Sequence, residues 1–214
     1  SECPALAPSR SQRHPRASHL YHTGPERHSD FMALLKIARM GHPVLRRRAA
    51  EVLDPTAPDI RRLVGDMIET MHDAEGAGLA APQVHVALRV VVFHVPAHRV
   101  SGVAGATAEA LTVLVNPTID VLDEEKEIGW EACLSVPGLM GAVARYSRVR
   151  YRGSDIDGRT IEREASGFHA RVVQHECDHL DGVLYPMRMT DLSLLGFADE
   201  MQKTFAEAKE DIRD

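Results

Sequence analysis

The amino-acid sequence predicts an α+β fold, with mixed or antiparallel strands packed around a central helix that carries an H-E-x-x-H pattern, and with a C-terminal amphipathic helix. Three observations favour this class. Short strand-like runs lie between well-separated helical segments, the two kinds of segment do not alternate regularly, and no internal repeat is visible. The chain of 214 residues is long enough for one domain with a substantial core and an extension.

The N-terminal segment 1–31 differs from the rest of the chain in composition. It is rich in Pro, Ser, Arg and His, has no hydrophobic periodicity, and lacks the apolar core of a secretory signal. We expect residues 1–31 to be a disordered extension, either translated from an upstream region or added for expression. Met32 has the context of a natural start, so the expected catalytic domain covers residues 32–214.

The segments between residues 57 and 164 predict one helix, two strands and a hairpin. In 57–75, apolar residues recur at helical spacing, and Gly76 is well placed to end the helix. Apolar runs at 88–95 and 111–116 predict strands, and the runs on either side of Asp157-Gly158 predict a hairpin over 147–164. The periodic apolar positions of the helix are Ile60, Leu63, Met67, Ile68 and Met71.

Two further helices are predicted near the C-terminus. The first covers 167–181, because Ser166 and Gly167 can start it and Gly182 can end it. The second is amphipathic and covers about 192–212. Its expected core contacts are Leu195, Met201 and Phe205.

The first of these helices contains the sequence QHECDHLDG. His175 and His179 are four residues apart, so their imidazoles project from one face, with Glu176 beside them. This H-E-x-x-H arrangement is typical of a metal site with a carboxylate next to the ion. Phe168 and Val172 extend the same face and predict an apolar wall beside the site. The alternative is an ordinary polar helix without a metal. Further metal ligands elsewhere in the chain are needed to decide between the two.

A third metal ligand must come from outside this helix. Cys177 is rotated by about 200° from His175, so its thiol points away, and we expect it to be a small buried residue. The metzincin pattern would require a histidine where this chain has Tyr185. Cys133, within the sequence EACLS, can approach from another segment and would give a Cys-His-His site with one open position. A buried free cysteine is the alternative for Cys133.

A glycine-rich stretch, GAGLAAPQ, covers residues 76–83. It nearly fits a dinucleotide-binding pattern, but it follows a helix and contains Pro82, so we discount nucleotide binding. A tight loop where the backbone approaches a ligand closely is the functional interpretation, with the Gln83 amide as a hydrogen-bond donor. A solvated surface amide is the alternative for Gln83.

Taken in order, GAGLAAPQ, EACLS and QHECDH resemble the three signature motifs of the peptide deformylases. The resemblance covers most of residues 32–190, and the order and spacing match as well as the residues. One position departs from the family pattern, because Ala132 replaces the usual glycine beside the cysteine. The matching residues are Gly76, Gly78, Ala80, Ala81, Gln83, Glu131, Cys133, Ser135, Gln174, His175, Glu176 and His179.

The resemblance implies a metal-dependent hydrolase that removes the formyl group from the N-terminal formylmethionine of new polypeptides and releases formate. It implies one divalent metal, held by Cys133, His175 and His179. Iron(II) is the expected ion, with zinc, nickel and cobalt as alternatives. Glu176 would move the proton of the attacking water. The Gln83 amide and the backbone N–H of Leu134 would stabilise the oxyanion.

The methionine side chain of such a substrate needs an apolar pocket. Helix phase places Phe168 and Val172 toward it, and the cysteine segment brings Trp130 near, although a role in the core is the alternative for all three. The expected substrate-binding residues are Gly78, Trp130, Phe168 and Val172. Of two nearby arginines, we expect Arg171 to be a surface or rim charge and Arg145 to pair with Glu131 or Asp178.

Composition limits the partners and the compartment. The net charge of −6 argues against a specific nucleic-acid partner, and no apolar run is long enough to span a bilayer. Three cysteines are too few for a disulfide framework and favour a reducing compartment. The resemblance to the deformylases implies nascent N-formylmethionyl polypeptides as partners, and with a reducing compartment we expect a bacterial cytoplasm. The ribosome is a further candidate partner, and an organelle remains an alternative location.

Two other functions fit part of the sequence. A zincin-type metallopeptidase needs only the HECDH helix and gives no role to Cys133 or Gln83. A metal-stabilised binding protein would keep the metal and lack turnover, with Ala132 as the cause of lost activity. Formate release from a formylated peptide would support a deformylase, internal peptide-bond cleavage a metallopeptidase, and bound metal without turnover a binding protein.

Overall fold

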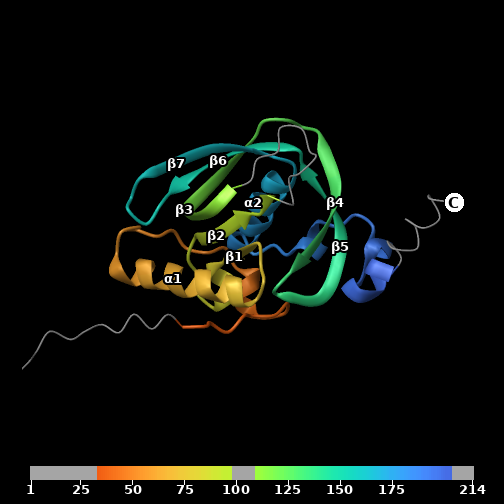
Figure 1. Cartoon of the computed structure of the whole chain (residues 1–214), viewed down its shortest axis with the longest axis horizontal. Helices are drawn as coiled ribbons and strands as arrows, with labels where there is room; N and C mark the ends of the chain where they lie inside the picture. The colour runs from red at the N-terminus through yellow and green to blue at the C-terminus, as the bar shows by residue number, and fades with distance from the viewer. Residues whose placement is uncertain (1–32, 98–108, 204–214) are drawn as a thin grey trace, which may run out of the picture. The chain divides into compact units, whose positions relative to one another are not determined.

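The predicted α+β class is confirmed by the computed structural model, which describes residues 33–97 and 109–203 (Figure 1). Two long α-helices, α1 (Pro58–Asp73) and α2 (Gly167–Leu180), and a short helical stretch at 198–203 combine with two antiparallel sheets in these residues. The predicted extension at 1–31 lies outside the described residues. No helix among the described residues is long and apolar enough to cross a membrane.

The larger sheet has five strands in the order β1-β2-β3-β6-β7. The predicted strands at 88–95 and 111–116 correspond to β2 and to part of β3. The predicted hairpin is formed by β6 and β7. Its last pair is Ser154 with Thr160, so the connecting loop is longer than a two-residue turn. Gly158 in that loop has φ 77°. The strands are β1 (Gly78–Ala80), β2 (Val90–Val95), β3 (Glu109–Val121), β6 (Arg148–Ser154) and β7 (Thr160–Ser166).

The smaller sheet has the order β4-β5-β8, and sequence analysis assigned none of its strands. Its members are β4 (Lys126–Cys133), β5 (Val136–Tyr146) and β8 (Leu195–Phe197). β4 is mostly solvent-exposed and β5 contains Pro137, Gly138 and Gly141, so neither has the regular alternation of a typical strand. Their pairing along almost the whole length of β4 stabilises both strands despite this composition.

Helix α1 forms where it was predicted and packs against β1 and β2. Ile60, Met67 and Met71 are buried, as the periodicity indicates. The predicted stop at Gly76 is wrong in detail, because Glu75 is the left-handed residue, with φ 53°. The N–H of Gly76 instead bonds to the Met71 carbonyl, which closes the helix end.

Helix α2 lies between the two sheets (Figure 1) and contacts β1, β2, β3, β5, β6 and β7. Every residue from His169 to Leu180 is buried except Arg171. The helix ends as predicted at Gly182, whose φ is 75°. The N–H of Val183 bonds to the Asp178 carbonyl at 2.9 Å and completes the helix end. The histidine pattern is therefore placed inside the protein.

The predicted C-terminal helix is wrong over its first six residues. Leu192–Leu194 form a 3₁₀ turn started by the Asp191 side chain, and β8 follows at once. Leu195 pairs with Gly141 of β5, so sheet pairing overrides the helical periodicity of this stretch. Residues 198–203 are helical, and the half-buried Met201 lies in this part. The remainder of the prediction, including Phe205, lies outside the described residues.

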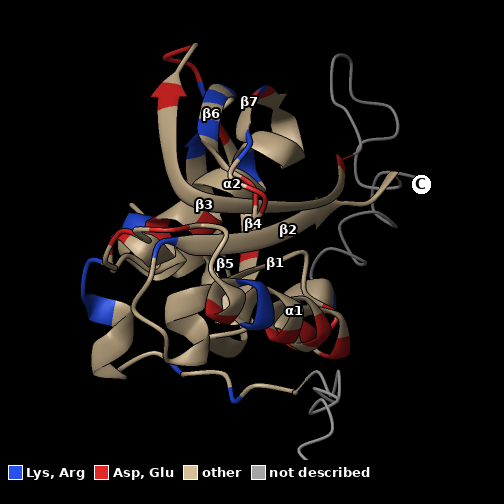
Figure 2. Cartoon of the chain, turned by 90° about the vertical axis from the view of Figure 1, so that its left-hand side faces the viewer, with Lys and Arg blue, Asp and Glu red and all other residues tan. Residues whose placement is uncertain are grey.

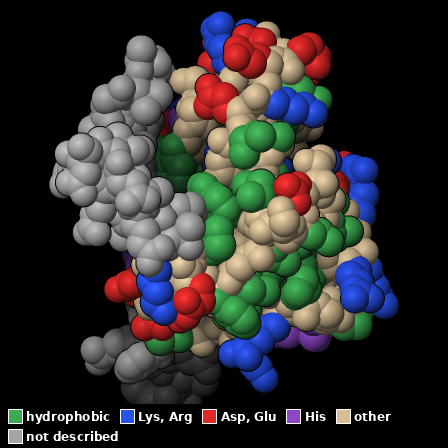
Figure 3. All heavy atoms as spheres, turned by 90° about the vertical axis from the view of Figure 1, so that its right-hand side faces the viewer, with side chains coloured by type: hydrophobic (Ala, Val, Ile, Leu, Met, Phe, Trp, Pro, Cys, Tyr) green, Lys and Arg blue, Asp and Glu red, His purple; other side chains and the backbone are tan. Residues whose placement is uncertain are grey.

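Arg and Glu residues occur along β6 and β7 (Figure 2). Arg148 and Arg150 both bond to Glu164, and Arg152 bonds to Asp120, at distances of 2.5–2.7 Å. β7 is the last strand of its sheet, and charges on such a strand oppose pairing with another chain. On the other side of the molecule, hydrophobic side chains gather on the face that carries β4 and β5 (Figure 3), and Ile128 and Phe197 are exposed among these strands.

The end of α2 gives a first prediction about stability. A Cβ on Gly182 would lie 2.7 Å from the backbone carbon of Arg46, and its φ of 75° disfavours other residues. We expect Gly182→Ala to lower the free energy of unfolding by about 2–4 kcal/mol, from left-handed strain plus overpacking. Urea unfolding followed by circular dichroism measures this difference.

Gly158→Ala is the matched control for this prediction. Gly158 has φ 77°, but a Cβ there would meet only the Thr56 methyl group, at 3.3 Å. This variant should lose about 1 kcal/mol from the backbone alone. Equal losses in the two variants would contradict the argument from the close approach of Arg46.

Candidate active site

Three segments that are distant in the sequence meet at one face of α2. They are β1 with the following 3₁₀ turn η2 (Ala81–Val84), the end of β4, and α2 itself. They enclose a cavity of about 680 Å³, a size typical of small-molecule sites. The predicted site residues that line it are Gly78, Gln83, Trp130, Cys133, Leu134, Phe168, Val172, His175 and Glu176. His179 is buried next to Cys133, behind the cavity wall.

Cys133, His175 and His179 form a cluster of potential metal ligands. Their ligand atoms lie within 4.8 Å of one another, and all three residues are buried. The Sγ of Cys133 is 3.4 Å from the Nε2 of His179. Tetrahedral bonds of about 2.3 Å to sulfur and 2.0 Å to nitrogen would separate the two atoms by about 3.5 Å. The donor set therefore fits one divalent ion of the zinc or iron(II) type.

The position of Cys133 is fixed by the turn that follows β4. The register of β4 and β5 shifts between Ala132 and Cys133, and Cys133 then pairs with Val136. The intervening turn is held from outside by the N–H of Met40, which bonds to the Ser135 carbonyl at 2.7 Å. This irregularity in the strand re-aims the thiol toward α2.

Glu131, a residue to which sequence analysis gave no role in the site, holds His175 in place. Its carboxylate accepts a hydrogen bond from His175 Nδ1 at 2.8 Å, and also bonds to Arg145 and Arg171. Although burial opposes ionisation, these hydrogen bonds keep the pKa of Glu131 far below its usual range. Because Nδ1 is bound to Glu131, the other ring nitrogen of His175 is directed to the cluster.

The two histidines have opposite electrostatic surroundings. Although burial opposes it, hydrogen bonds to Cys133 and Glu131 raise the pKa of His175 to about 10. Burial, together with the positive charges of His175 and Arg145, lowers the pKa of His179 well below its usual value. The cluster thus attracts one positive charge, a proton or a metal ion, on the side of His175 and keeps His179 neutral.

Glu176 lies fully inside the site, next to the backbone of β1. Burial raises the pKa of its carboxyl group to about 7. Its Oε2 has no hydrogen-bond partner in the described part of the chain. A Cβ on Gly78 would overlap the Glu176 carboxylate, so glycine is required at this position for steric reasons. The carboxylate is consequently placed to exchange a proton with a molecule in the cavity.

Gln83 is buried, and its amide has one defined orientation. Its Oε1 accepts a hydrogen bond from the N–H of Ala80 at 2.9 Å, so the amide NH₂ must point the other way. That NH₂ donates to Ser135 Oγ at 3.1 Å and to Cys133 Sγ at 3.5 Å. The solvated-surface alternative for Gln83 is therefore wrong, since the amide faces the cluster.

The predictions for the two arginines, Arg145 and Arg171, had different outcomes. The expected pairing of Arg145 is confirmed, because it bonds to both Glu131 and Asp178. Arg171, expected as a surface or rim charge, lines the cavity, but the surface alternative is wrong, since its side chain is only 12% exposed. Besides Glu131, Arg171 donates to the carbonyls of Glu127, Gly129 and Val143. Backbone acceptors of this kind leave no signal in a sequence.

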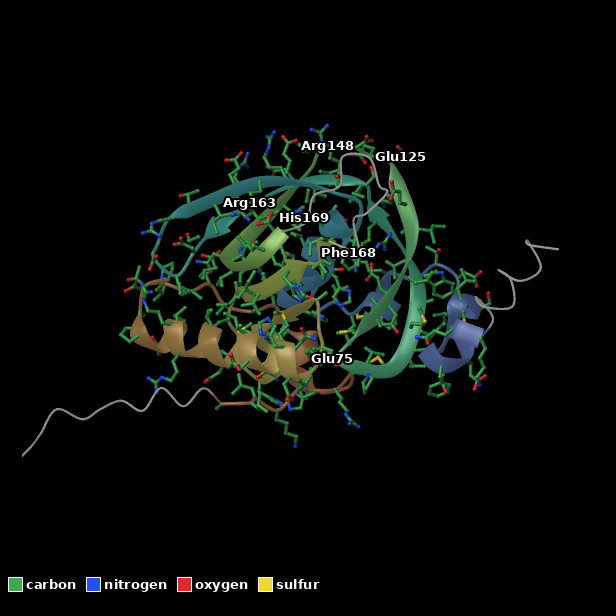
Figure 4. All side chains as sticks on the ribbon, in the orientation of Figure 1. Glu75, Glu125, Arg148, Arg163, Phe168 and His169 are labelled. Carbon is green, nitrogen blue, oxygen red and sulfur yellow. The ribbon has the colours of Figure 1, made fainter. Side chains whose placement is uncertain are left out.

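Cys177 is buried in the core with a free thiol, as expected, and burial raises its pKa. Sequence analysis missed part of the cavity wall, namely Leu139 and Met140 of β5 and Ala198 and Gln202 near the C-terminus. In Figure 4, Glu75 and Phe168 mark two further parts of that wall, one after α1 and one at the start of α2. The pairing of strands places the residues from β5 and from the C-terminal part beside the cavity, and sequence analysis did not predict this pairing.

Comparison with known proteins gives a consistent family. The family model described as polypeptide deformylase matches residues 34–194. Peptide deformylase 1 of Bordetella pertussis is 53% identical over 163 residues, which cover 76% of this chain and 92% of that protein. Peptide deformylase 2 of Ralstonia nicotianae is 52% identical over 163 residues, covering 76% of this chain and 91% of that protein.

Solved structures agree with this result. Peptide deformylase from Ehrlichia chaffeensis has a TM-score of 0.69 and 32% identity, and the match covers 83% of this chain and 97% of that one. A class I type b peptide deformylase from Acinetobacter baumannii, with Met-Ala-Ser bound, has a TM-score of 0.67 and 34% identity, covering 74% and 99%. With the motifs and the cavity in place, this chain belongs to the peptide deformylase family.

Proposed function

We propose that this chain carries out the deformylase reaction in the cavity beside α2, with one divalent metal held by Cys133, His175 and His179. The chain is a metal-dependent hydrolase that removes the formyl group from N-terminal methionine peptides, as its family membership implies. The observation that carries the proposed site is the buried Cys-His-His cluster, with Glu176 in the same cavity. A metallopeptidase has no comparable support, because it gives no role to Cys133.

The reaction breaks the C–N bond of the formamide. Water adds to the formyl carbon, and the amine leaves with a proton, giving formate and a free N-terminal methionine. A bound divalent metal would supply a lowered water pKa and a polarised formyl carbonyl. Glu176 accepts the proton of the attacking water and delivers it to the leaving amine. Its buried position and pKa of about 7 suit a group that must both take and return a proton.

The oxyanion that forms during addition needs hydrogen-bond donors. The amide NH₂ of Gln83 donates to Ser135 Oγ and to Cys133 Sγ, and the hydrogen directed at the thiol is the one proposed to turn to the oxyanion. The Leu134 backbone N–H lies in the turn directly after Cys133 and is the second proposed donor. Each such donor typically contributes about 3–4 kcal/mol to transition-state stabilisation.

The substrate methionine would occupy the apolar part of the cavity. Phe168 and Val172 line it from α2, and Trp130, with 36% of its surface exposed, lines it from β4. Gly78 would bring the β1 backbone close to the peptide. The A. baumannii relative with bound Met-Ala-Ser supports a peptide that begins with methionine as the ligand class.

We propose iron(II) as the physiological metal, with zinc, nickel and cobalt as alternatives that the donor set also accepts. We also propose residues 32–214 as the catalytic domain and the bacterial cytoplasm as its location. Its relatives come from bacteria, and nascent formylated chains are the expected substrates. We further propose that this chain contacts the ribosome directly. An organelle stays the alternative location.

The role of the cysteine can be tested with a matched pair of variants. Cys133→Ala should reduce metal content well below one ion per chain and abolish formate release, because two imidazoles alone hold the metal weakly. Cys177→Ala should keep about one ion per chain, since that thiol lies in the core. Anaerobic iron(II) loading followed by elemental analysis gives both values. Full metal retention in Cys133→Ala would refute this ligand set.

Replacement of the proposed base gives a second test. Glu176→Gln should lower kcat for a formyl-Met-Ala peptide by about 10²–10⁴-fold, because the amide cannot accept a proton. Metal content should stay at that of the unmodified chain. Glu125→Gln, at an exposed position outside the cavity, is the control and should stay within about twofold. A Glu176→Gln variant with full activity would remove Glu176 from the mechanism.

The proposed oxyanion donor gives a third test. Gln83→Leu should lower kcat by about 10²–10³-fold with a small change in KM, because the lost donor acts mainly in the transition state. Ser135→Ala removes the hydrogen bond that Gln83 makes outside the oxyanion site, and should cost far less. Equal losses in kcat for both variants would show that Gln83 acts through the packing of the turn.

A further inference from the structure

A second cavity lies on the other side of α2, away from the histidines. It has a volume of about 630 Å³ and takes its base from Cys177, Asp178 and Gln174 of the helix. β3, the start of β4 and the end of β5 form its walls. Its size is within the range of small-molecule sites, and the proposed reaction uses none of its space.

The charges that line this cavity are mainly positive. Arg89, Lys126, Arg145 and Arg188 contribute four cations, against the two carboxylates of Asp178 and Asp181. Arg145 and Arg188 share Asp178, and Arg89 pairs with Asp181. Glu131 also bonds to Arg145, so the four cations face three carboxylates and Lys126 is the cation in excess that an entering anion meets.

Lys126 is the cation best placed to meet such an anion. Its ammonium lies 4.5 Å from the ring centroid of Tyr146, and none of the salt bridges among the described residues involves it. Glu125 and Glu127 flank it in the chain but do not line the cavity. A cation over an aromatic ring keeps its charge available to a ligand that approaches from the cavity.

The remaining wall of the cavity is apolar. Pro117, Ile119 and Val121 of β3 contribute to it, together with Ala144 and Met187. A ligand that matches both parts has an anionic group and a compact apolar body. We propose that this cavity binds a small organic carboxylate, with its charge between Lys126 and Arg188 and its apolar part against β3.

This site shares residues with the support of the metal cluster. Arg188 Nη2 bonds to Asp178 at 2.6 Å, and Arg145 joins Asp178 to Glu131, which holds His175. An anion that draws Arg188 away leaves Asp178 to compete with Glu131 for Arg145. Bound carboxylate should therefore lower kcat, an effect that rests on the proposed function.

Sodium benzoate is a suitable probe, because it joins a carboxylate to a flat apolar ring. Its binding can be followed on the zinc-loaded full chain by NMR of ¹³C-labelled methionine methyl groups. Met187 lines the second cavity and Met140 lines the first, so the two resonances report the two sites separately. Benzamide, of the same shape without the charge, is the control ligand.

We expect the Met187 resonance to shift and saturate at millimolar benzoate, the affinity range of so small a ligand, while benzamide produces less than about a third of this shift at the same concentration. Lys126→Met and Arg188→Met should each raise Kd about two- to fivefold, as the loss of a partly exposed ion pair does. Absence of a Met187 shift up to about 50 mM benzoate would overturn the site. A shift of Met140 alone would place benzoate at the metal cluster and also overturn it.

Kinetic measurements test separately whether a carboxylate in the second cavity lowers kcat. Saturating benzoate should lower kcat about fivefold at unchanged KM, and Arg188→Met should remove this effect. A rise in KM without a change in kcat would show competition at the first cavity and would overturn the coupling. A chain that releases no formate would refute the proposed function, while the Met187 titration would still decide the second site.

Discussion

The buried carboxylate of Glu131 is the interaction on which the arrangement of the site depends. Its side chain is 3% exposed and bonds to Arg145, Arg171 and His175. Burial of a lone carboxylate costs several kcal/mol, and here three cationic or donor groups offset that cost. Loss of Glu131 would leave Arg145 with Asp178 as its carboxylate partner and Arg171 with backbone carbonyls alone, so the arrangement of the group depends on Glu131.

This group also explains why three distant segments meet. Glu131 belongs to β4, Arg145 to β5, and Arg171 and His175 to α2. Arg171 adds bonds to carbonyls of both strands, so the β4–β5 hairpin is attached to the helix by charge-assisted hydrogen bonds. A Cβ on Gly129 would lie 2.7 Å from the Arg171 guanidinium, so a larger residue there would displace this side chain from its bonds. The proposed metal ligands Cys133 and His175 take their separation from this attachment.

The sequence predicts those parts of the structure that local chemistry controls. Helices α1 and α2, β2, part of β3 and the β6–β7 hairpin follow from periodicity, helix ends and a turn. The spacing of His175 and His179 follows from helix geometry, and charge matching anticipated the pairing of Arg145. The resemblance of the three motifs to a known family selected Cys133 and Gln83, for which the residues alone left alternatives open.

The parts that sequence analysis missed depend on contacts between distant segments. β4 and β5 have irregular composition and form through cross-strand pairing, and β8 exists because Leu195 reaches Gly141. Arg171 was assigned to the surface or rim because a charged residue on a helix usually lies there, and its acceptors are backbone carbonyls.

The conformation and position of Ala132 bear on the hypothesis of a metal-stabilised binding protein that lacks turnover. Its φ is not in the left-handed region, so the methyl group adds no backbone strain at this position. Ala132 is exposed and lines the cavity, whereas Cys133 and Glu131 beside it are buried. Alanine in place of glycine therefore changes the shape of the cavity wall. It leaves the Cys-His-His cluster and the charged residues that support it unchanged.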